Sequence, residues 1–293
     1  MSLVIDTFMC RKDNYGYLAH DAETGRTAAI DAPDAGAILA ALKTRGWRLT
    51  DIFITHHHGD HVEGIPLLVE AFGARVTGPR AEMERIKGLD VAVEPGETVE
   101  LGATGFTVMA APGHTLGHIV YYDAAGGHLF TGDALFSLGV GRMFEGTPGP
   151  MWQGLAALRD LPDETLVYCG HEYTVANAKF ALSVDPGNSA LKIRAAEAER
   201  ARAEGRFTIP VSLGLEKRTN PFLRVDTTPI ARAMNLVPAD PIGVFAALRK
   251  AKDDFSQIST RTGPPPRIVR SAGTGATARH RATRLRAGER GCC

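Results

Sequence analysis

Residues 55–61 read THHHGDH, so four of the ten histidines of this 293-residue chain lie within six consecutive positions. Clustered imidazoles repel one another when protonated, but neutral imidazole is the commonest metal ligand and Asp adds an anionic oxygen. On an extended backbone His56 and His58 point to one side and His57 to the other. A turn at Gly59 would bring the following Asp and His beside them. The run therefore predicts half of a two-metal site.

Three later segments each place a candidate ligand directly after a glycine. They read PGHTLGH at 112–118, FTGD at 130–133 and YCGH at 168–171, and the candidates are His114, Asp133 and His171. Glycine lets the backbone turn sharply and approach a metal closely. A lone histidine is more often a core or surface residue, but the repeated pattern favours ligands here.

The elements that must position these residues alternate through about residue 172. Apolar patterns predict several short strands, among them 49–54 ending at the histidine run, and helices at 35–45, 62–72 and 150–160. Open α/β sheets usually carry their sites at the carboxyl ends of strands. Beyond that point helical patterns dominate, at 174–183, 190–204 and 241–254. We therefore expect a catalytic domain over 1–173, a helical domain over 174–255 and a basic, disordered tail over 256–293.

These motifs resemble the metallo-β-lactamase superfamily pattern T-H-x-H-x-D-H, and their spacing resembles the glyoxalase II (hydroxyacylglutathione hydrolase) family over about residues 1–255. The resemblance implies an α/β (α+β) fold, an αββα sandwich with a C-terminal helical domain. By position it implies two metals, with Asp133 bridging them. One metal would be bound by His56, His58 and His114, and the other by Asp60, His61 and His171.

Five further histidines and Cys169 lie outside the predicted ligand set. The family has a histidine at His118 that supports the site without ligating, so we interpret His118 as orienting a ligand. His57 is expected not to ligate, and we interpret His20, His128 and His280 as structural. Cys169 beside His171 raises the hypothesis of a nucleophilic thiol, but a cysteine at a strand end is usually just buried.

A two-metal centre suits thioester hydrolysis. Two metals about 3.5 to 4 Å apart can share a water and lower its pKa toward about 7. We therefore expect a metal-held hydroxide as nucleophile, with Asp60 and Asp133 as the catalytic carboxylates. A thiol with a pKa of about 8.5 departs as thiolate without a general acid. Zinc is the first expectation on this nitrogen-rich ligation, and iron and manganese are the alternatives.

Arg249 and Lys252 are candidates for substrate binding because they lie at i and i+3 and would share a helix face. Their alternative reading is a solvated helix face. In the family this R-x-x-K position binds the glycine carboxylate of glutathione. Residues 141–147 resemble the family segment G-[KR]-x-[FY]-E-G-T, although Val140 stands where many relatives have Cys and Phe144 lacks a hydroxyl. The further candidate contacts are Arg142, Phe144, His171 and Tyr173.

The resemblance implies hydrolysis of S-D-lactoylglutathione to D-lactate and glutathione, the second step of methylglyoxal detoxification. One rival is a glutathione-persulfide dioxygenase of the same fold, which would use mononuclear iron and consume oxygen. A second rival is a noncatalytic protein that binds metal or, through its basic tail, nucleic acid. The full second ligand set and the Arg249/Lys252 face argue against both rivals.

Composition and charge limit the partners and the cellular compartment that we expect. The chain is 44% hydrophobic with a formal net charge of zero, but residues 256–293 hold eight Arg against one Glu, which leaves the remainder acidic. An acidic body argues against nucleic acid as the main partner. The four cysteines suggest no disulfide framework, and no signal peptide or membrane span is evident. We expect a cytoplasmic monomer whose activity survives truncation after about Phe255, with no role assigned to Cys292 and Cys293.

Overall fold

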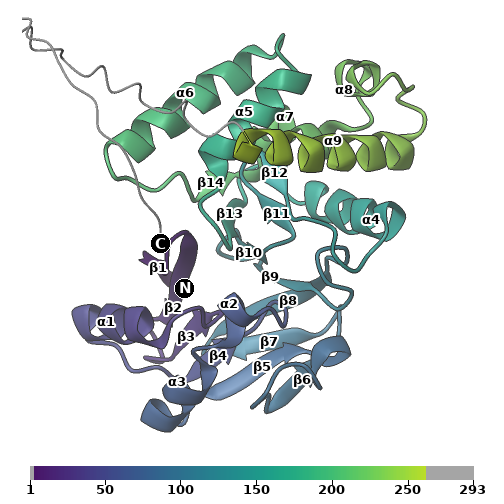
Figure 1. Ribbon diagram of the computed structural model, residues 1–293. Coiled ribbons are helices and arrows are strands. Elements are labelled where there is room, and N and C mark those ends of the chain that lie inside the picture. The colour runs from purple at the N-terminus through teal and green to yellow at the C-terminus, as the bar shows by residue number, and fades with distance from the viewer. Residues whose placement is uncertain (1–2, 262–293) are drawn as a thin grey trace, which may run out of the picture.

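The computed structural model describes residues 3–261, with side chains through Phe255. Two six-stranded sheets form its centre, and helices cover both outer sides (Figure 1). This architecture is the αββα sandwich expected from the sequence. None of the helices over the described residues is long and apolar enough to cross a membrane.

The first sheet has the order β1-β2-β3-β4-β5-β6. Its first three strands are antiparallel, and β3 through β6 are parallel. Parallel neighbours need crossover connections, which here include helices α1 and α3. The bounds are β1 Leu3–Cys10, β2 Asn14–Asp21, β3 Thr27–Ile30, α1 Ala35–Arg45, β4 Asp51–Phe53, α2 Gly59–Val62, α3 Ile65–Phe72, β5 Arg75–Pro79, η1 Arg80–Glu82 and β6 Val91–Val93.

The second sheet has the order β14-β13-β10-β9-β8-β7 and is antiparallel except for the pair β10 and β13. A small hairpin, β11 with β12, follows β10. The bounds are β7 Thr98–Leu101, β8 Thr104–Ala110, β9 Ile119–Asp123, β10 His128–Gly132, β11 Leu135–Phe136, β12 Gly139–Val140, α4 Pro148–Arg159, β13 Leu166–Cys169 and β14 Val211–Ser212.

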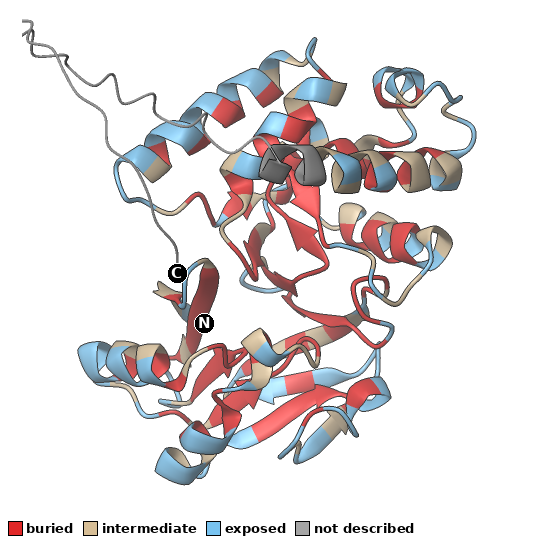
Figure 2. Ribbon diagram, viewed as in Figure 1, coloured by how far each residue is buried: buried red, intermediate tan, exposed pale blue. Residues whose placement is uncertain are grey.

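Successive side chains of a strand point to opposite faces of its sheet, which explains how each sheet packs on its partner and on helices. In β2, Tyr17 and Ala19 face the second sheet and join one core, whereas Leu18 faces α1 and α3 and joins another. Such a period of two is what a sheet buried on both faces requires. Phe53 of β4 and Phe106 of β8 meet edge to face across the sandwich at 5.7 Å. Figure 2 shows the buried residues concentrated in the strands.

The C-terminal helices lie at one end of the sandwich (Figure 1). Helix α9 packs on α4, where the rings of Phe245 and Trp152 lie 6.2 Å apart. The buried carboxylate of Glu216 accepts bonds from Ser137 and Leu138, which ties α7 to the β11–β12 hairpin. The bounds are α5 Thr174–Val184, α6 Ser189–Ala203, α7 Leu213–Thr219, η2 Pro221–Arg224, α8 Thr228–Ala233 and α9 Pro241–Arg261.

Two sequence predictions differ in detail from the structure. The helix predicted over 62–72 begins only at Ile65 as α3, because α2 ends at Val62 and the Gly64 N–H between them donates to the Ala32 carbonyl at 2.8 Å. Helix α9 continues through Arg261, past the predicted start of the tail at 256. The rest of the predicted tail, from 262 on, lies outside the described residues, and the domain boundaries stay a prediction.

Candidate active site

Seven predicted ligands come together from four loops that follow strands β4, β8, β10 and β13. Their ligand atoms form groups of three in which all atoms lie within 4.8 Å of one another. These groups are His56, His58 and His114; Asp60, His61 and His171; and His56, His61 and Asp133. Because such histidine and aspartate clusters are typical of metal centres, the site is one for divalent metal.

The first triad is made of nitrogen atoms alone. His58 Nδ1 lies 3.1 Å from His56 Nε2 and 2.9 Å from His114 Nε2. Residues 56 and 58 point to the same side, as the alternation of an extended run predicts. Burial, together with repulsion from other histidines, holds the pKa of His56 well below its usual value. The triad therefore presents neutral imidazoles, the form that binds metal.

The second triad adds a carboxylate. Asp60 Oδ2 lies 3.3 Å from His171 Nε2 and 3.8 Å from His61 Nε2, and the two imidazole nitrogens are 3.4 Å apart. Burial alone would lower the pKa of His171, but hydrogen bonds to Asp133 and Asp60 outweigh it and raise the pKa to about 10. Positive charge is stabilised at this point, as a site for a divalent cation requires.

Asp133 lies between the two triads. Its Oδ2 is 3.4 Å from His114 Nε2 in the first and 3.4 Å from His171 Nε2 in the second. Its Oδ1 is buried and accepts no hydrogen bond from the described residues, although His61 Nε2 lies 3.4 Å away. A buried carboxylate oxygen without a hydrogen bond is costly unless a cation satisfies it. This oxygen fits a metal ligand at the position predicted for the bridge.

The outer nitrogens of three histidines are held by other groups. His61 Nδ1 contacts Asp31 Oδ2 at 2.8 Å, His171 Nδ1 contacts Asp13 Oδ1 at 3.1 Å, and His114 Nδ1 contacts a backbone carbonyl oxygen at 2.9 Å. Ligating histidines commonly donate their second N–H in this way, which leaves the inner nitrogen free for metal. The donor set therefore fits divalent metal.

Glycines before two of the ligands are required by close packing. A Cβ at Gly170 would lie 2.3 Å from Asp133 Oδ1. Gly132 has φ +47°, and a Cβ there would lie 2.5 Å from the hydroxyl oxygen of Thr55. Both contacts are too short for any side chain. The strand-glycine-ligand pattern of the sequence thus reflects backbone approach to the centre.

His118 and Cys169 belong to neither triad but contact Asp133 and residues of the triads. The backbone N–H of Asp133 donates to His118 Nε2 at 3.2 Å, and the His118 ring stacks on His56 with centroids 4.7 Å apart. His118 therefore orients ligands from outside both triads. Burial raises the pKa of the Cys169 thiol to about 12, and its Sγ donates to the His171 carbonyl. A thiol in this state is no nucleophile near neutral pH.

Two aromatic side chains border the metal centre. The exposed ring of Phe144 lies 5.8 Å from His58 and 5.3 Å from His114, both edge to face. The ring of Tyr173 stacks on His171 at 4.8 Å with an interplanar angle of 5°. Arg142 lies over Phe144, with its guanidinium carbon 5.8 Å from the ring centroid. These predicted substrate contacts therefore adjoin the first and second triads.

Arg249 and Lys252 are near each other but differ in surroundings. Arg249 is only 5% exposed, and its Nη1 donates to the Val140 carbonyl at 3.0 Å while Nη2 contacts Asp253 at 3.1 Å. Its buried Nε has no hydrogen-bond partner among the described residues. The two residues share a helix face as predicted, but Nη1 of Arg249 already holds the segment that leads to Arg142.

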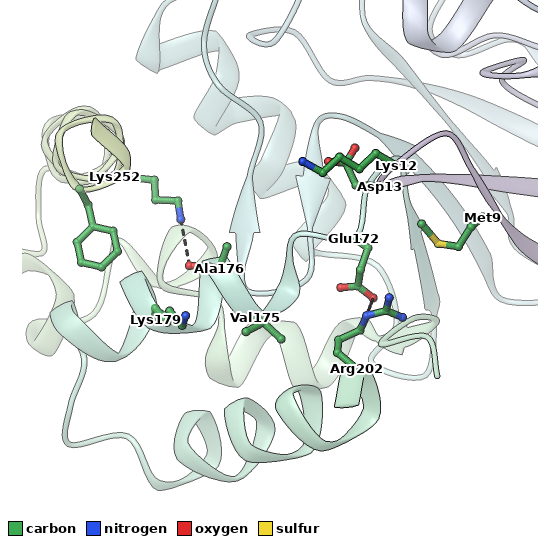
Figure 3. A pocket seen from close by; sticks show the side chains of 10 residues that line it. Met9, Lys12, Asp13, Glu172, Val175, Ala176, Lys179, Arg202 and Lys252 are labelled. Carbon is green, nitrogen blue, oxygen red and sulfur yellow. Dashed lines mark hydrogen bonds and ion pairs between the residues drawn. The ribbon is translucent and has the colours of Figure 1, made fainter. Parts of the chain in front are cut away.

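Lys252 lines a cavity of about 600 Å³ between the β1–β2 turn, α5 and α9. Figure 3 shows its ammonium extending from α9 toward the carbonyl of Ala176, 3.4 Å away. Lys12 and Lys179 line the same cavity, and Glu172 lies on its wall near Arg202. Burial, with repulsion from Arg249, lowers the pKa of Lys252 to about 8. Four cations and two carboxylates, the second being Asp13, therefore line the cavity beside four uncharged residues.

Sequence reasoning missed Asp31, Asp13 and Asn14. Asp31 accepts from the Thr55 N–H at 2.8 Å and contacts His61, and it takes a left-handed backbone with φ 58°. Asn14 donates to Asp60 Oδ2 at 3.1 Å. Asp31 directly follows β3, so its position at a strand end was an available signal. Asp13 and Asn14 lie at the β1–β2 turn and carry no such signal.

Two family models match consecutive parts of the chain. The family model described as the metallo-beta-lactamase superfamily matches residues 2–171, and that described as the hydroxyacylglutathione hydrolase C-terminus matches 172–255. A hydroxyacylglutathione hydrolase of Rhizobium meliloti is 51% identical over 254 residues, 87% of this chain and 99% of that protein. One of Brucella anthropi is 53% identical over 253 residues, 86% of this chain and 97% of that protein.

Solved structures share the fold at lower identity. ETHE1 from Myxococcus xanthus is 26% identical with a TM-score of 0.61, over 91% of this chain and 95% of that chain. TTHA1623, solved in a di-iron-bound form, is 28% identical with a TM-score of 0.53, over 75% of this chain and 100% of that chain.

Proposed function

The chain belongs to the hydroxyacylglutathione hydrolase family of the metallo-beta-lactamase superfamily, and on that premise we propose that it hydrolyses S-D-lactoylglutathione to D-lactate and glutathione. The observation that carries the proposal is the match to the Rhizobium meliloti enzyme over 99% of that protein. This match includes both the ligand loops and the C-terminal helices. The glutathione-persulfide dioxygenase is the weaker alternative, since mononuclear iron would leave Asp60, His61 and His171 without a metal.

The two triads would hold two divalent metals, with Asp133 shared between them. When bound, such metals supply a hydroxide nucleophile near neutral pH and polarise the carbonyl that it attacks. Zinc is our first choice for this donor set, and iron and manganese suit it as well. The di-iron form of the neighbour TTHA1623 supports a pair of metals on this fold.

Residues around the triads orient the candidate ligands, and the site favours a thioester over an amide. Asp31 and Asp13 hold the outer nitrogens of His61 and His171, so that their inner nitrogens face Asp60 and Asp133. No side chain has to protonate the leaving group, because a thiol with a pKa of about 8.5 departs as thiolate. A thioester therefore suits this site better than an amide, whose amine would need a proton.

We propose that the glutathione part lies along Phe144, Tyr173 and Lys252. Phe144 and Tyr173 offer flat apolar surfaces beside the metal triads. Lys252 supplies a cation at the border of the cavity in Figure 3. Arg142 is a further donor for a carboxylate, and so is the Nε of Arg249, which has no hydrogen-bond partner among the described residues. Glutathione carries two carboxylates, so a cavity whose lining has more cations than carboxylates attracts it.

The test is turnover of S-D-lactoylglutathione by metal-quantified protein, followed at the thioester absorbance. We expect fast hydrolysis with about two metals per chain, and loss of hydrolysis in Asp60→Ala, since a two-metal site needs both triads. Oxygen consumption with glutathione persulfide, at one iron per chain, would establish the alternative instead.

We also propose that the enzyme works as a monomer in the cytoplasm. All seven candidate ligands, Tyr173 and Lys252 come from one chain, so no second copy is needed to complete the site. Light scattering coupled to size exclusion would give a mass near 31.3 kDa for the monomer. A mass of twice this value at assay concentrations would contradict it.

A further inference from the structure

His57 is the one histidine of the run 56–61 that belongs to neither triad, and it lies between two carboxylates. Its Nδ1 is 2.7 Å from Glu82 Oε2, and its Nε2 is 3.7 Å from Glu145 Oε1. Only 9% of the His57 side chain is exposed. The carboxylates come from two different parts of the chain, η1 and the loop 141–147.

The buried carboxylate of Glu82 joins the two loops that carry the first triad. From the loop 55–61 it accepts the backbone N–H and the ring N–H of His57, both at 2.7 Å. From the loop 112–118 it accepts the Gly117 N–H at 3.0 Å and the Thr115 hydroxyl. A Cβ at Gly117 would lie 2.5 Å from Glu82 Cγ, so the loop closes tightly on this side chain.

Glu145 attaches the loop 141–147 to the same structure. Its carboxylate accepts the Leu116 N–H at 3.0 Å and the Arg85 guanidinium at 2.7 Å. The neighbouring Gly146 N–H donates to the Gly113 carbonyl at 3.2 Å. This loop also carries Phe144, whose ring lies against His58 and His114.

Hydrogen bonding, rather than a further metal, explains this cluster. His57, Glu82 and Glu145 are close enough to resemble a metal site. However, each of the four carboxylate oxygens already accepts a bond from a protein donor. A metal would have to displace several charge-assisted bonds, each worth about 1.5 to 3 kcal/mol. The cluster is therefore complete without an ion.

We propose that Glu82, His57 and Glu145, which we term the His57 clamp, position the loop carrying Arg142 and Phe144 relative to the ligands of the first triad. The clamp rests on the proposed function for the identity of the metals and the substrate. None of its members contacts the reacting atoms, so all three are positioning residues. Glu82 holds the loops 55–61 and 112–118 at a fixed distance from each other. His57, which contacts both carboxylates, fixes Glu145 and the loop 141–147 relative to Glu82.

The first test concerns metal binding and uses Glu82→Gln. The substitution replaces one acceptor oxygen with an NH₂ group, so a donor of the loops then faces another donor. Zinc affinity, measured by chelator competition on the purified protein, should fall about tenfold to 100-fold, as for other residues that support ligands. Glu84→Gln, at an exposed position two residues along, is the matched control and should bind zinc as the wild type does. Equal zinc affinity in Glu82→Gln and the control would overturn the proposed role of Glu82.

The second test separates substrate positioning from metal binding. His57→Asn keeps a donor near the Nδ1 position for Glu82 but lacks the Nε2 that faces Glu145. Glu145→Gln weakens the same link from the other side, at a partly exposed residue whose change leaves the buried carboxylate of Glu82 intact. Both variants should retain zinc affinity and raise KM for S-D-lactoylglutathione several-fold with kcat little changed. An unchanged KM in both variants would contradict the clamp, even if Glu82→Gln fails to fold.

The two proposals fail in different ways. If the zinc-loaded wild type does not hydrolyse S-D-lactoylglutathione, the proposed function is wrong, and chelator competition on Glu82→Gln still decides the role of Glu82. If the wild type hydrolyses the thioester and neither zinc affinity nor KM changes in the variants, the clamp alone is wrong.

Discussion

The sandwich and the C-terminal helices contribute different kinds of side chain to one site. All seven candidate metal ligands lie in loops after strands of the sandwich, and most are buried. The C-terminal helices contribute cations, of which Lys252 lines the cavity beside the second triad. We propose that strand ends fix the chemistry, whereas a helix face selects the molecule on which it is performed.

The largest expected effect comes from removing the carboxylate between the triads. Asp133→Ala should lower kcat/KM at least about 10³-fold, because several kcal/mol of charge stabilisation would be lost. Metal analysis should then find fewer metals than in Asp60→Ala, since Asp133 contacts both triads and Asp60 only the second. Full metal content and activity in Asp133→Ala would show that the chemistry lies elsewhere.

Removing the helix cation should affect binding rather than chemistry. Lys252→Ala should raise KM for S-D-lactoylglutathione roughly tenfold, since a hydrogen bond to a charged group contributes about 1.5 to 3 kcal/mol. Steady-state kinetics should show kcat within about twofold of the wild type. Lys250→Ala is the matched control, because Lys250 lies on the same helix but is exposed and pairs with Asp254. A fall in kcat with unchanged KM would contradict the proposal that the helices bind the substrate and the strand ends perform the chemistry.

The charge of Lys252 also predicts a pH dependence. Because burial and Arg249 lower its pKa to about 8, the ammonium is charged below pH 8 and loses its charge as the pH rises through that value. We therefore expect kcat/KM, which reports ionisations of the free enzyme and substrate, to fall several-fold above about pH 8. The amino group of the substrate titrates in the same range, so Lys252→Arg is the control. Arginine stays charged, and a profile identical to that of the wild type would contradict the assignment.

The smallest effect should come from the end of the chain. The match to the Rhizobium meliloti enzyme spans 254 residues, and α9 continues through Arg261. Removing residues 262–293 should leave kcat and KM unchanged, because the cavity and both triads lie upstream. A folded truncated protein with lower turnover would assign a function to the segment.

Local pattern in the sequence was enough to select the candidate ligands that the structure brings together, but not the residues that support them. His114, Asp133 and His171 each follow a glycine, and packing at Gly132 and Gly170 shows why. Glu82 has no such mark, since its four hydrogen bonds reach residues 25 to 35 positions away. Such partners are set by tertiary packing, which a single sequence does not reveal.

The sequence predicted that Arg249 and Lys252 share a helix face, but it did not predict that Arg249 is buried. Positions 249 and 252 share a face because three residues make nearly one helical turn. The burial of Arg249 against the Val140 carbonyl follows from how α9 packs on the hairpin that contains β12. Likewise, the late start of α3 at Ile65 goes with the hydrogen bond from the Gly64 N–H to the Ala32 carbonyl, a contact between segments some 30 residues apart.

The most direct test of the account compares two thioesters with the same acyl group. The kcat/KM values for S-D-lactoylglutathione and for S-D-lactoyl-N-acetylcysteamine, which lacks both carboxylates, are measured in the wild type and in Lys252→Ala. We predict that the wild type prefers the glutathione ester and that the substitution lowers its kcat/KM about tenfold, while the smaller ester is hydrolysed equally well by both proteins. An equal loss for both esters, or no preference in the wild type, would contradict the claim that the C-terminal helices select the substrate of the metal centre.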